Sequence, residues 1–94
     1  MKNNKKDPQK MSNNIDFSYP IIDTKATGEN IRKLQDQRKM TVKKLQQILN
    51  LESEQSIYKW YRGASIPSLD NLVALSSIFE VKIDDILVVQ KKSA

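Results

Sequence analysis

The helical spacing of the apolar residues between positions 24 and 88 limits the fold more than any other feature. In the segment 54–61, for example, Ile57, Trp60 and Tyr61 recur at i, i+3 and i+4, which places them on one side of a helix. Strands would alternate every second residue, and only two glycines and three prolines are present to form tight turns. The sequence therefore predicts an all-α fold.

Five short helices are expected from this spacing and from the residues that can cap them. Side chains of Ser and Thr at an N-cap accept hydrogen bonds from the free N–H groups of the first turn. Thr24 or Thr27 can cap the first helix, and Thr41, Ser53 and Ser68 can cap the next three. Gly63 can end the third helix as a C-cap in the left-handed conformation. The expected helices span residues 24 or 27 to 39, 42–49, 54–61, 69–79 and 84–88.

Two apolar strips in the last third of the chain receive different roles. One forms the inward side of the fourth helix: Leu69, Leu72, Val73, Leu75, Ser76 and Phe79. The other contains more apolar residues than a short fifth helix needs for its own packing, so we expect it to contribute to a homodimer interface. It consists of Ile83, Ile86, Leu87, Val88 and Val89.

The chain divides into three parts by composition. Residues 1–14 are rich in Lys, Asn and Gln and bury too little apolar surface to offset the entropy of ordering, so we expect a disordered basic arm. Residues 15–89 form the expected folded domain, with the apolar segment 15–22 extended against it. Residues 90–94 form a polar tail.

The missing residue types argue against catalysis and metal binding. The chain has no cysteine and no histidine, so the commonest nucleophiles, general bases and transition-metal ligands are lacking. Asp84 and Asp85 are better explained as acidic residues at a helix N-terminus than as metal ligands. We expect no enzyme, no cofactor, no metal and no small-molecule substrate. With no long apolar run and no secretory signal, we also expect no membrane association and a cytoplasmic location.

Positive charge is concentrated in the first half of the expected domain. The whole chain has a net charge of +5, and residues 24–62 hold nine Lys and Arg against four Asp and Glu. Residues 63–88 hold one Lys against four Asp and Glu. A basic half is typical of nucleic-acid binding, although a solvated charged surface explains the charge count equally well.

The second and third expected helices, with a short turn between them, form a candidate helix-turn-helix. If Ile57 and Trp60 face the core, the third helix presents polar side chains that can bond base edges or phosphates. Lys43 and Lys44 would lie beside the DNA backbone at the start of the second helix. The candidate DNA-binding residues are Lys43, Lys44, Glu54, Gln55, Ser56, Tyr58, Lys59 and Arg62.

Residues 27–87 resemble the phage repressor and Cro-like helix-turn-helix family, also called Xre-like. The resemblance is carried by SIYKWYRG and IPSLDNL, which together match the pattern I-x-x-W-x-x-G-x-x-x-P-x-x-x-x-L. It implies a compact, five-helix, lambda-repressor-like domain whose third helix enters the major groove. By the same resemblance, Gln55 and Lys59 stand at positions that read bases, while Ser56 and Arg62 stand at phosphate positions.

The chain departs from the family pattern at the start of the second helix. Val42 stands where the family usually has a glutamine that bonds phosphate. Lys44 stands where a glutamate often completes a capping box with Thr41.

Two functions from different classes follow from these observations. The first is a sequence-specific transcriptional regulator, a repressor that binds double-stranded DNA as a homodimer. The second is a protein-interaction module or antitoxin-type partner protein that has lost specific DNA binding, as acidic Glu54 and aromatic Tyr58 on the outer face would allow. A regulatory protein partner is compatible with both.

Overall fold

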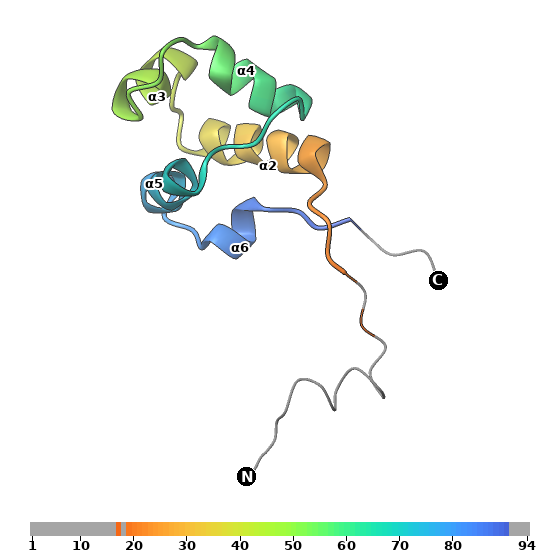
Figure 1. The fold of residues 1–94 in the computed structure, drawn as a ribbon. Coiled ribbons are helices and arrows are strands. Elements are labelled where there is room, and N and C mark those ends of the chain that lie inside the picture. The colour runs from red at the N-terminus through yellow and green to blue at the C-terminus, as the bar shows by residue number, and fades with distance from the viewer. Residues whose placement is uncertain (1–16, 18, 91–94) are drawn as a thin grey trace.

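The computed structural model of the protein describes residue 17 and residues 19–90. The predicted arm at residues 1–14 and all but the first residue of the predicted tail lie outside this part of the chain. Figure 1 labels five helices in it, and they confirm the predicted all-α fold. The helices are α2 (Thr24–Gln37), α3 (Val42–Ile48), α4 (Gln55–Arg62), α5 (Leu69–Phe79) and α6 (Ile83–Ile86).

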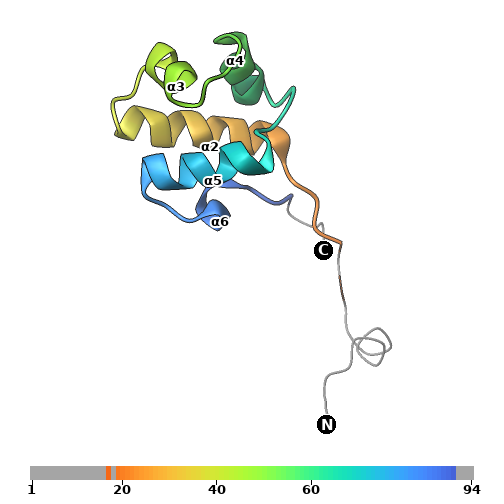
Figure 2. The ribbon, with the colours of Figure 1, turned by 60° about the vertical axis from the view of Figure 1, so that its left-hand side comes forward.

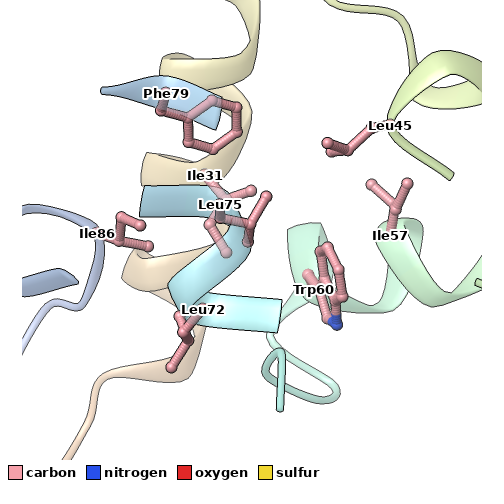
Figure 3. Packing of buried hydrophobic residues seen from close by; sticks show 8 residues of the cluster. All are labelled: Ile31, Leu45, Ile57, Trp60, Leu72, Leu75, Phe79 and Ile86. Carbon is pink, nitrogen blue, oxygen red and sulfur yellow. The ribbon is translucent and has the colours of Figure 1, made fainter. Parts of the chain in front are cut away.

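The longest helix, α2, lies at the centre of the fold. Figures 1 and 2 show α3 and α4 on one side of it and α5 and α6 on the other. Each of the five helices contributes to the apolar core between them, shown in Figure 3. The buried core residues are Ile31, Leu45, Ile57, Trp60, Leu72, Leu75, Phe79 and Ile86.

The predicted caps of α3 and α5 are confirmed. The Thr41 hydroxyl accepts a hydrogen bond from the Lys44 N–H at 3.0 Å, even though Lys44 cannot complete a capping box as a glutamate would. The Ser68 hydroxyl likewise accepts from the Asn71 N–H at 3.2 Å. Both helices therefore start where local side-chain chemistry predicts.

The predicted cap of α2 is wrong. Asp23 is the N-cap, and its carboxylate accepts a hydrogen bond from the Ala26 N–H at 2.9 Å. Thr24 lies inside the helix, and Thr27 is fully buried. The Thr27 hydroxyl accepts a hydrogen bond from the Val88 N–H at 2.9 Å, so it ties α2 to the C-terminal segment.

The start of α4 is one residue later than predicted. Its first residue is Gln55, and Glu54 stands at the N-cap without a capping hydrogen bond from its side chain. Ser53, the predicted cap, still accepts a hydrogen bond from the Gln55 N–H at 3.2 Å. Its hydroxyl therefore satisfies a free N–H group at the start of the helix from outside the N-cap position.

The fifth helix is shorter and earlier than predicted, because the chain becomes extended at Leu87. The following residues pair with the segment before α2 through an isolated antiparallel bridge between Ile22 and Val89. The Asp23 N–H donates to the Val88 carbonyl at 2.7 Å, and the Gln90 N–H donates to the Ile21 carbonyl at 2.7 Å. In the described part of the segment 15–22, Ile22 is half-buried whereas Phe17, Tyr19 and Ile21 are exposed. The expectation that this segment packs against the domain is therefore confirmed only at its last residues.

The C-terminal apolar strip does not form the free surface that a dimer interface needs. Ile86 is fully buried, and Leu87 is half-buried against the core. Ile83 and Val88 are half-buried as well, and the Val88 carbonyl accepts a hydrogen bond from the Asp23 N–H. Val89 is the strip's exposed member. The expectation that this strip has apolar surface left over for a dimer interface is therefore wrong, because packing of the short α6 and the bridge at Val89 already involve it.

Two residues assigned to the inward side of α5 face outward instead. Leu69 is 80% exposed and Val73 is 59% exposed. Each residue of an α-helix is rotated about 100° from the one before it, so Val73 lies well away from the line of Leu72, Leu75 and Phe79. The buried stripe of α5 is therefore narrower than its apolar composition predicts.

Candidate nucleic-acid interface

Helix α4 has one buried face and one polar, exposed face. Ile57 is fully buried and Trp60 is 4% exposed, so Trp60 belongs to the core, as predicted (Figure 3). The exposed side chains follow i, i+3, i+4 and i+7, which places them in one stripe along the opposite side of the helix. They are Gln55, Tyr58, Lys59 and Arg62.

The other four predicted residues are placed less uniformly. Lys43 and Lys44 are exposed in the first turn of α3, whereas Glu54 and Ser56 are half-buried at the start of α4. Val42 and Tyr58 line a common pocket, so the start of α3 adjoins the exposed stripe of α4. The two lysines follow directly after Val42 on α3, so they stand outside the stripe of α4.

A close backbone approach holds α4 against α2. A Cβ atom at Gly28 would lie 1.7 Å from the Trp60 carbonyl oxygen, far inside any contact distance. Only glycine allows this spacing, so Gly28 fixes how near α4 can come to α2. No spacing or capping pattern in the sequence distinguishes Gly28 from its neighbours. A glycine inside a predicted helix lowers helical stability, and this cost was the one feature of the sequence that could have indicated a close contact at this position.

A buried hydrogen-bond network fixes the same pair of helices. Gln35 on α2 is 2% exposed. Its amide group donates to the Met40 carbonyl at 2.9 Å, and its amide oxygen accepts from the Tyr61 hydroxyl. Because a buried amide needs partners for both its N–H and its oxygen, Gln35 couples the α2–α3 turn to α4.

Tyr61 is the residue of α4 on which several contacts meet. Its ring packs edge-on against Tyr58, with centroids 5.8 Å apart, and the Arg32 guanidinium carbon lies 5.2 Å from its centroid. Partial burial raises the pKa of the Tyr61 hydroxyl above its ordinary value, because the charged form would lose solvation. Tyr61 is therefore neutral at physiological pH and acts as a packing and hydrogen-bonding residue.

The end of α4 is confirmed at Gly63. This residue has φ = 75°, in the left-handed region that glycine adopts without steric cost. A Cβ atom there would also lie 2.7 Å from the backbone of Lys25 in α2. Both glycines of the chain thus stand where α4 touches α2.

The part of the chain that forms α2, α3 and α4 carries a net positive charge. Lys43, Lys44, Lys59 and Arg62 are all exposed, and nine Lys and Arg occur in residues 24–62 against four Asp and Glu. Chemically, the stripe combines amide, hydroxyl and cationic donors that can bond base edges and phosphate oxygens. Within residues 17 and 19–90, no group of three or more acidic, His or Cys side chains could hold a metal ion.

No helix in the described part of the chain is long and apolar enough to cross a membrane.

Comparison with known proteins gives the family. No curated protein sequence matches the chain. A family model described as the Cro/C1-type helix-turn-helix DNA-binding domain matches residues 30–92, which is about two-thirds of the chain and includes α3, α4 and α5. The chain therefore belongs to the Cro/C1-type helix-turn-helix DNA-binding domains.

Proposed function

We propose that the protein is a sequence-specific transcriptional regulator that places α4 in the major groove of an operator and acts as a repressor. The observation that carries this proposal is the exposed stripe of Gln55, Tyr58, Lys59 and Arg62 on a helix whose other face is locked into the core. Gln bonds adenine bidentately, and Lys reaches the O6 and N7 atoms of guanine. A rigidly mounted helix can hold these groups in the fixed positions that base recognition needs.

Selection from a randomised duplex pool tests this proposal. We expect the wild-type protein to enrich one sequence, and we expect the variant Gln55→Ala/Lys59→Ala to lose that enrichment. Lys33→Ala is the matched control for the lost cation, because Lys33 is exposed on α2 and faces away from the core. Binding without enrichment would contradict sequence specificity, and no binding at low salt would contradict DNA binding itself.

We propose further that the protein binds DNA as a homodimer. One helix as short as α4 contacts only a few base pairs, whereas two helices about 34 Å apart read two half-sites one DNA turn apart. The exposed pair Leu69 and Val73 on α5 offers apolar surface for such an association. We expect Leu69→Glu to lower the dimer fraction in sedimentation velocity, with Gln47→Glu as the control that adds a charge at an exposed polar position on α3. An unchanged dimer would exclude this surface.

The same pair supports a second candidate function, a protein-interaction module or antitoxin-type partner. Leu69 is the most exposed large apolar side chain of α5, and monomeric proteins seldom leave neighbouring apolar residues in water without a reason. Salt dependence separates the two functions. A DNA-binding protein loses affinity steeply as salt rises, with a log–log slope of about −0.9 per phosphate contacted, whereas a protein-interaction module shows no DNA retention.

A further inference from the structure

A pocket lies beside the exposed stripe of α4, and apart from Tyr58 it is lined by residues that the candidate DNA-binding set does not include. It has a volume of about 380 Å³ and opens between the second half of α2, the start of α3 and the middle of α4. Its charged lining residues are Arg32, Asp36 and Lys39, so the pocket holds one more cation than carboxylate. Tyr58 and Tyr61 form its wall on the α4 side.

The cations of this pocket are available to a ligand. The ion pair recorded in residues 17 and 19–90 joins Arg38 to Glu80 at 3.4 Å, so within that part of the chain neither Arg32 nor Lys39 is in a salt bridge. Both side chains are exposed. An anion entering the pocket would therefore meet cations that no described carboxylate already occupies.

Arg32 is also held in place before any ligand arrives. Its guanidinium carbon lies 5.2 Å from the centroid of the Tyr61 ring, within the range of a cation–π contact. The Tyr61 hydroxyl is itself bonded to the buried Gln35, which prevents the ring from moving freely. Less side-chain entropy is then lost when Arg32 binds, and its planar fork suits the bidentate contact that phosphate oxygens accept.

The pocket lies where a DNA backbone strand would pass. A helix with its side chains is about 10–12 Å wide, and the major groove is about 12 Å wide. A phosphate strand must therefore lie against each flank of a helix that enters the groove. Tyr58 belongs both to the outer stripe of α4 and to the pocket wall, so the pocket is the α2-side flank of that helix.

We propose that this pocket binds one phosphate group of the DNA backbone, with Arg32 as its main ligand and Lys39 as a second cation. The inference rests on the proposed function, because the phosphate belongs to the duplex that α4 reads. Tyr61 is a positioning residue here, since it acts on the phosphate through Arg32. The pocket adds affinity without adding sequence information, because phosphates are the same at every base pair.

The first test compares two variants that each lose one cation from α2. Arg32→Gln removes the pocket ligand, and Lys33→Gln removes the neighbouring exposed cation, which does not line the pocket. We expect Arg32→Gln to reduce the salt slope of operator binding by about 0.9, the value for one phosphate. Between about 50 mM and about 200 mM salt the wild type then loses about 3.5-fold more affinity than this variant. The Lys33→Gln slope should stay near that of the wild type, and both variants should select the wild-type sequence.

The second test locates the phosphate. Each backbone phosphate of the selected duplex is replaced in turn by a neutral methylphosphonate, and affinity is measured with wild type and with Arg32→Gln. We expect one position at which the methylphosphonate lowers the affinity of the wild type but does not further lower the affinity of Arg32→Gln. A double-mutant cycle requires this result for two groups that contact each other directly. Lys33→Gln should lose the full amount at that position.

The outcomes separate this inference from the function beneath it. A wild type that binds its operator while Arg32→Gln keeps the wild-type salt slope and the same methylphosphonate profile would overturn the pocket assignment alone. A wild type that binds no duplex at low salt would overturn the proposed function, and the phosphate assignment with it.

Discussion

Helices α4 and α5 are both amphipathic, but their outer faces differ in chemistry. The outer face of α4 carries amide, hydroxyl and cationic groups, whereas that of α5 carries the exposed apolar pair Leu69 and Val73. A hydrated polyanion favours the first kind of surface, and another protein surface favours the second. The two outer faces are therefore consistent with the two proposed kinds of partner, DNA for α4 and a protein surface for α5.

The inner faces differ as well. The contact of α4 with α2 combines the close approach at Gly28 with the buried network of Gln35 and Tyr61. The contact of α5 with the core is made mainly by the apolar side chains of Leu72, Leu75 and Phe79. Polar networks and backbone contacts set an orientation more narrowly than apolar packing does, which suits the proposed role of α4 in presenting side chains to bases.

The largest expected effect follows from removing the close approach of α4. In Gly28→Ala, the new methyl group collides with the Trp60 carbonyl oxygen, so the two helices must separate. We expect a loss of about 3 kcal/mol in the free energy of unfolding. Urea denaturation measures it, with Lys33→Ala on the exposed side of α2 as the control. A stability equal to the wild type would show that the position of α4 does not depend on this contact.

A smaller effect is expected when the outer face of α4 is altered without changing its position. Gln55→Ala removes one of the side chains proposed to read bases from an exposed position, so the fold should be retained. We expect about 1–3 kcal/mol less discrimination against the wrong base at one operator position, measured by competition binding. Ser77→Ala, an exposed polar position on α5, should leave discrimination unchanged. Equal losses from both variants would remove the distinction between the two faces.

Tyr61→Phe tests the buried hydrogen-bond network between α4 and α2. Its expected effect in kcal/mol is similar to or smaller than that of Gln55→Ala. Loss of the hydroxyl leaves the oxygen of the buried Gln35 without its partner, which we expect to cost about 1–2 kcal/mol of unfolding free energy. Chemical denaturation at neutral pH measures this loss.

The same residue predicts an alkaline pH dependence. Burial raises the pKa of Tyr61 in the folded state above the ordinary value of 10.0, so above pH 10 the unfolded chain releases this proton more readily than the folded one. The stability that this group contributes is present below pH 10 and is lost as pH rises through the folded pKa. Tyr61→Phe should therefore lose less stability above pH 10 than the wild type. Ser76→Ala, which removes the α5 hydrogen bond to the Val81 carbonyl but titrates nothing, should keep the wild-type pH profile.

The smallest effect is expected where the two helices end. Both end in the left-handed region, α4 at Gly63 with φ = 75° and α5 at Glu80 with φ = 58°. Glu80 bears the steric cost that Gly63 avoids, so we expect Glu80→Gly to raise the free energy of unfolding by about 0.5–1 kcal/mol. The exposed ion pair of Glu80 with Arg38 contributes little against this gain. Thermal denaturation measures the change, and a lower melting temperature would contradict it.

Local side-chain chemistry explains which predictions about the fold were confirmed. The caps at Thr41 and Ser68, the end of α4 at Gly63 and the burial of Ile57 and Trp60 each depend on residues close together in the chain. The errors involve residues distant in the chain. Thr27 does not cap α2 because its hydroxyl bonds Val88, and the helix after Lys82 stops early because the following residues pair with the segment before α2.

The candidate site divides in the same way. The helical repeat was enough to predict that Gln55, Tyr58, Lys59 and Arg62 share the outer side of α4, and the structure exposes all four. Nothing in the local pattern distinguishes Arg32 from the other cations of α2, and its place in a pocket depends on the packing of α4 against that helix. Whether the predicted residues contact DNA is still a prediction.

The sequence by itself determined the all-α class, the order of the helices, most of their limits and the family, because periodicity, capping and motif spacing act within a few residues. The tertiary structure alone decided how close α4 lies to α2, which apolar residues of α5 stay in water and what surrounds Arg32. These depend on contacts between residues far apart in the chain, such as Gly28 with Trp60 and Gln35 with Tyr61. Such contacts form only when the helices pack, and no local pattern encodes their distances.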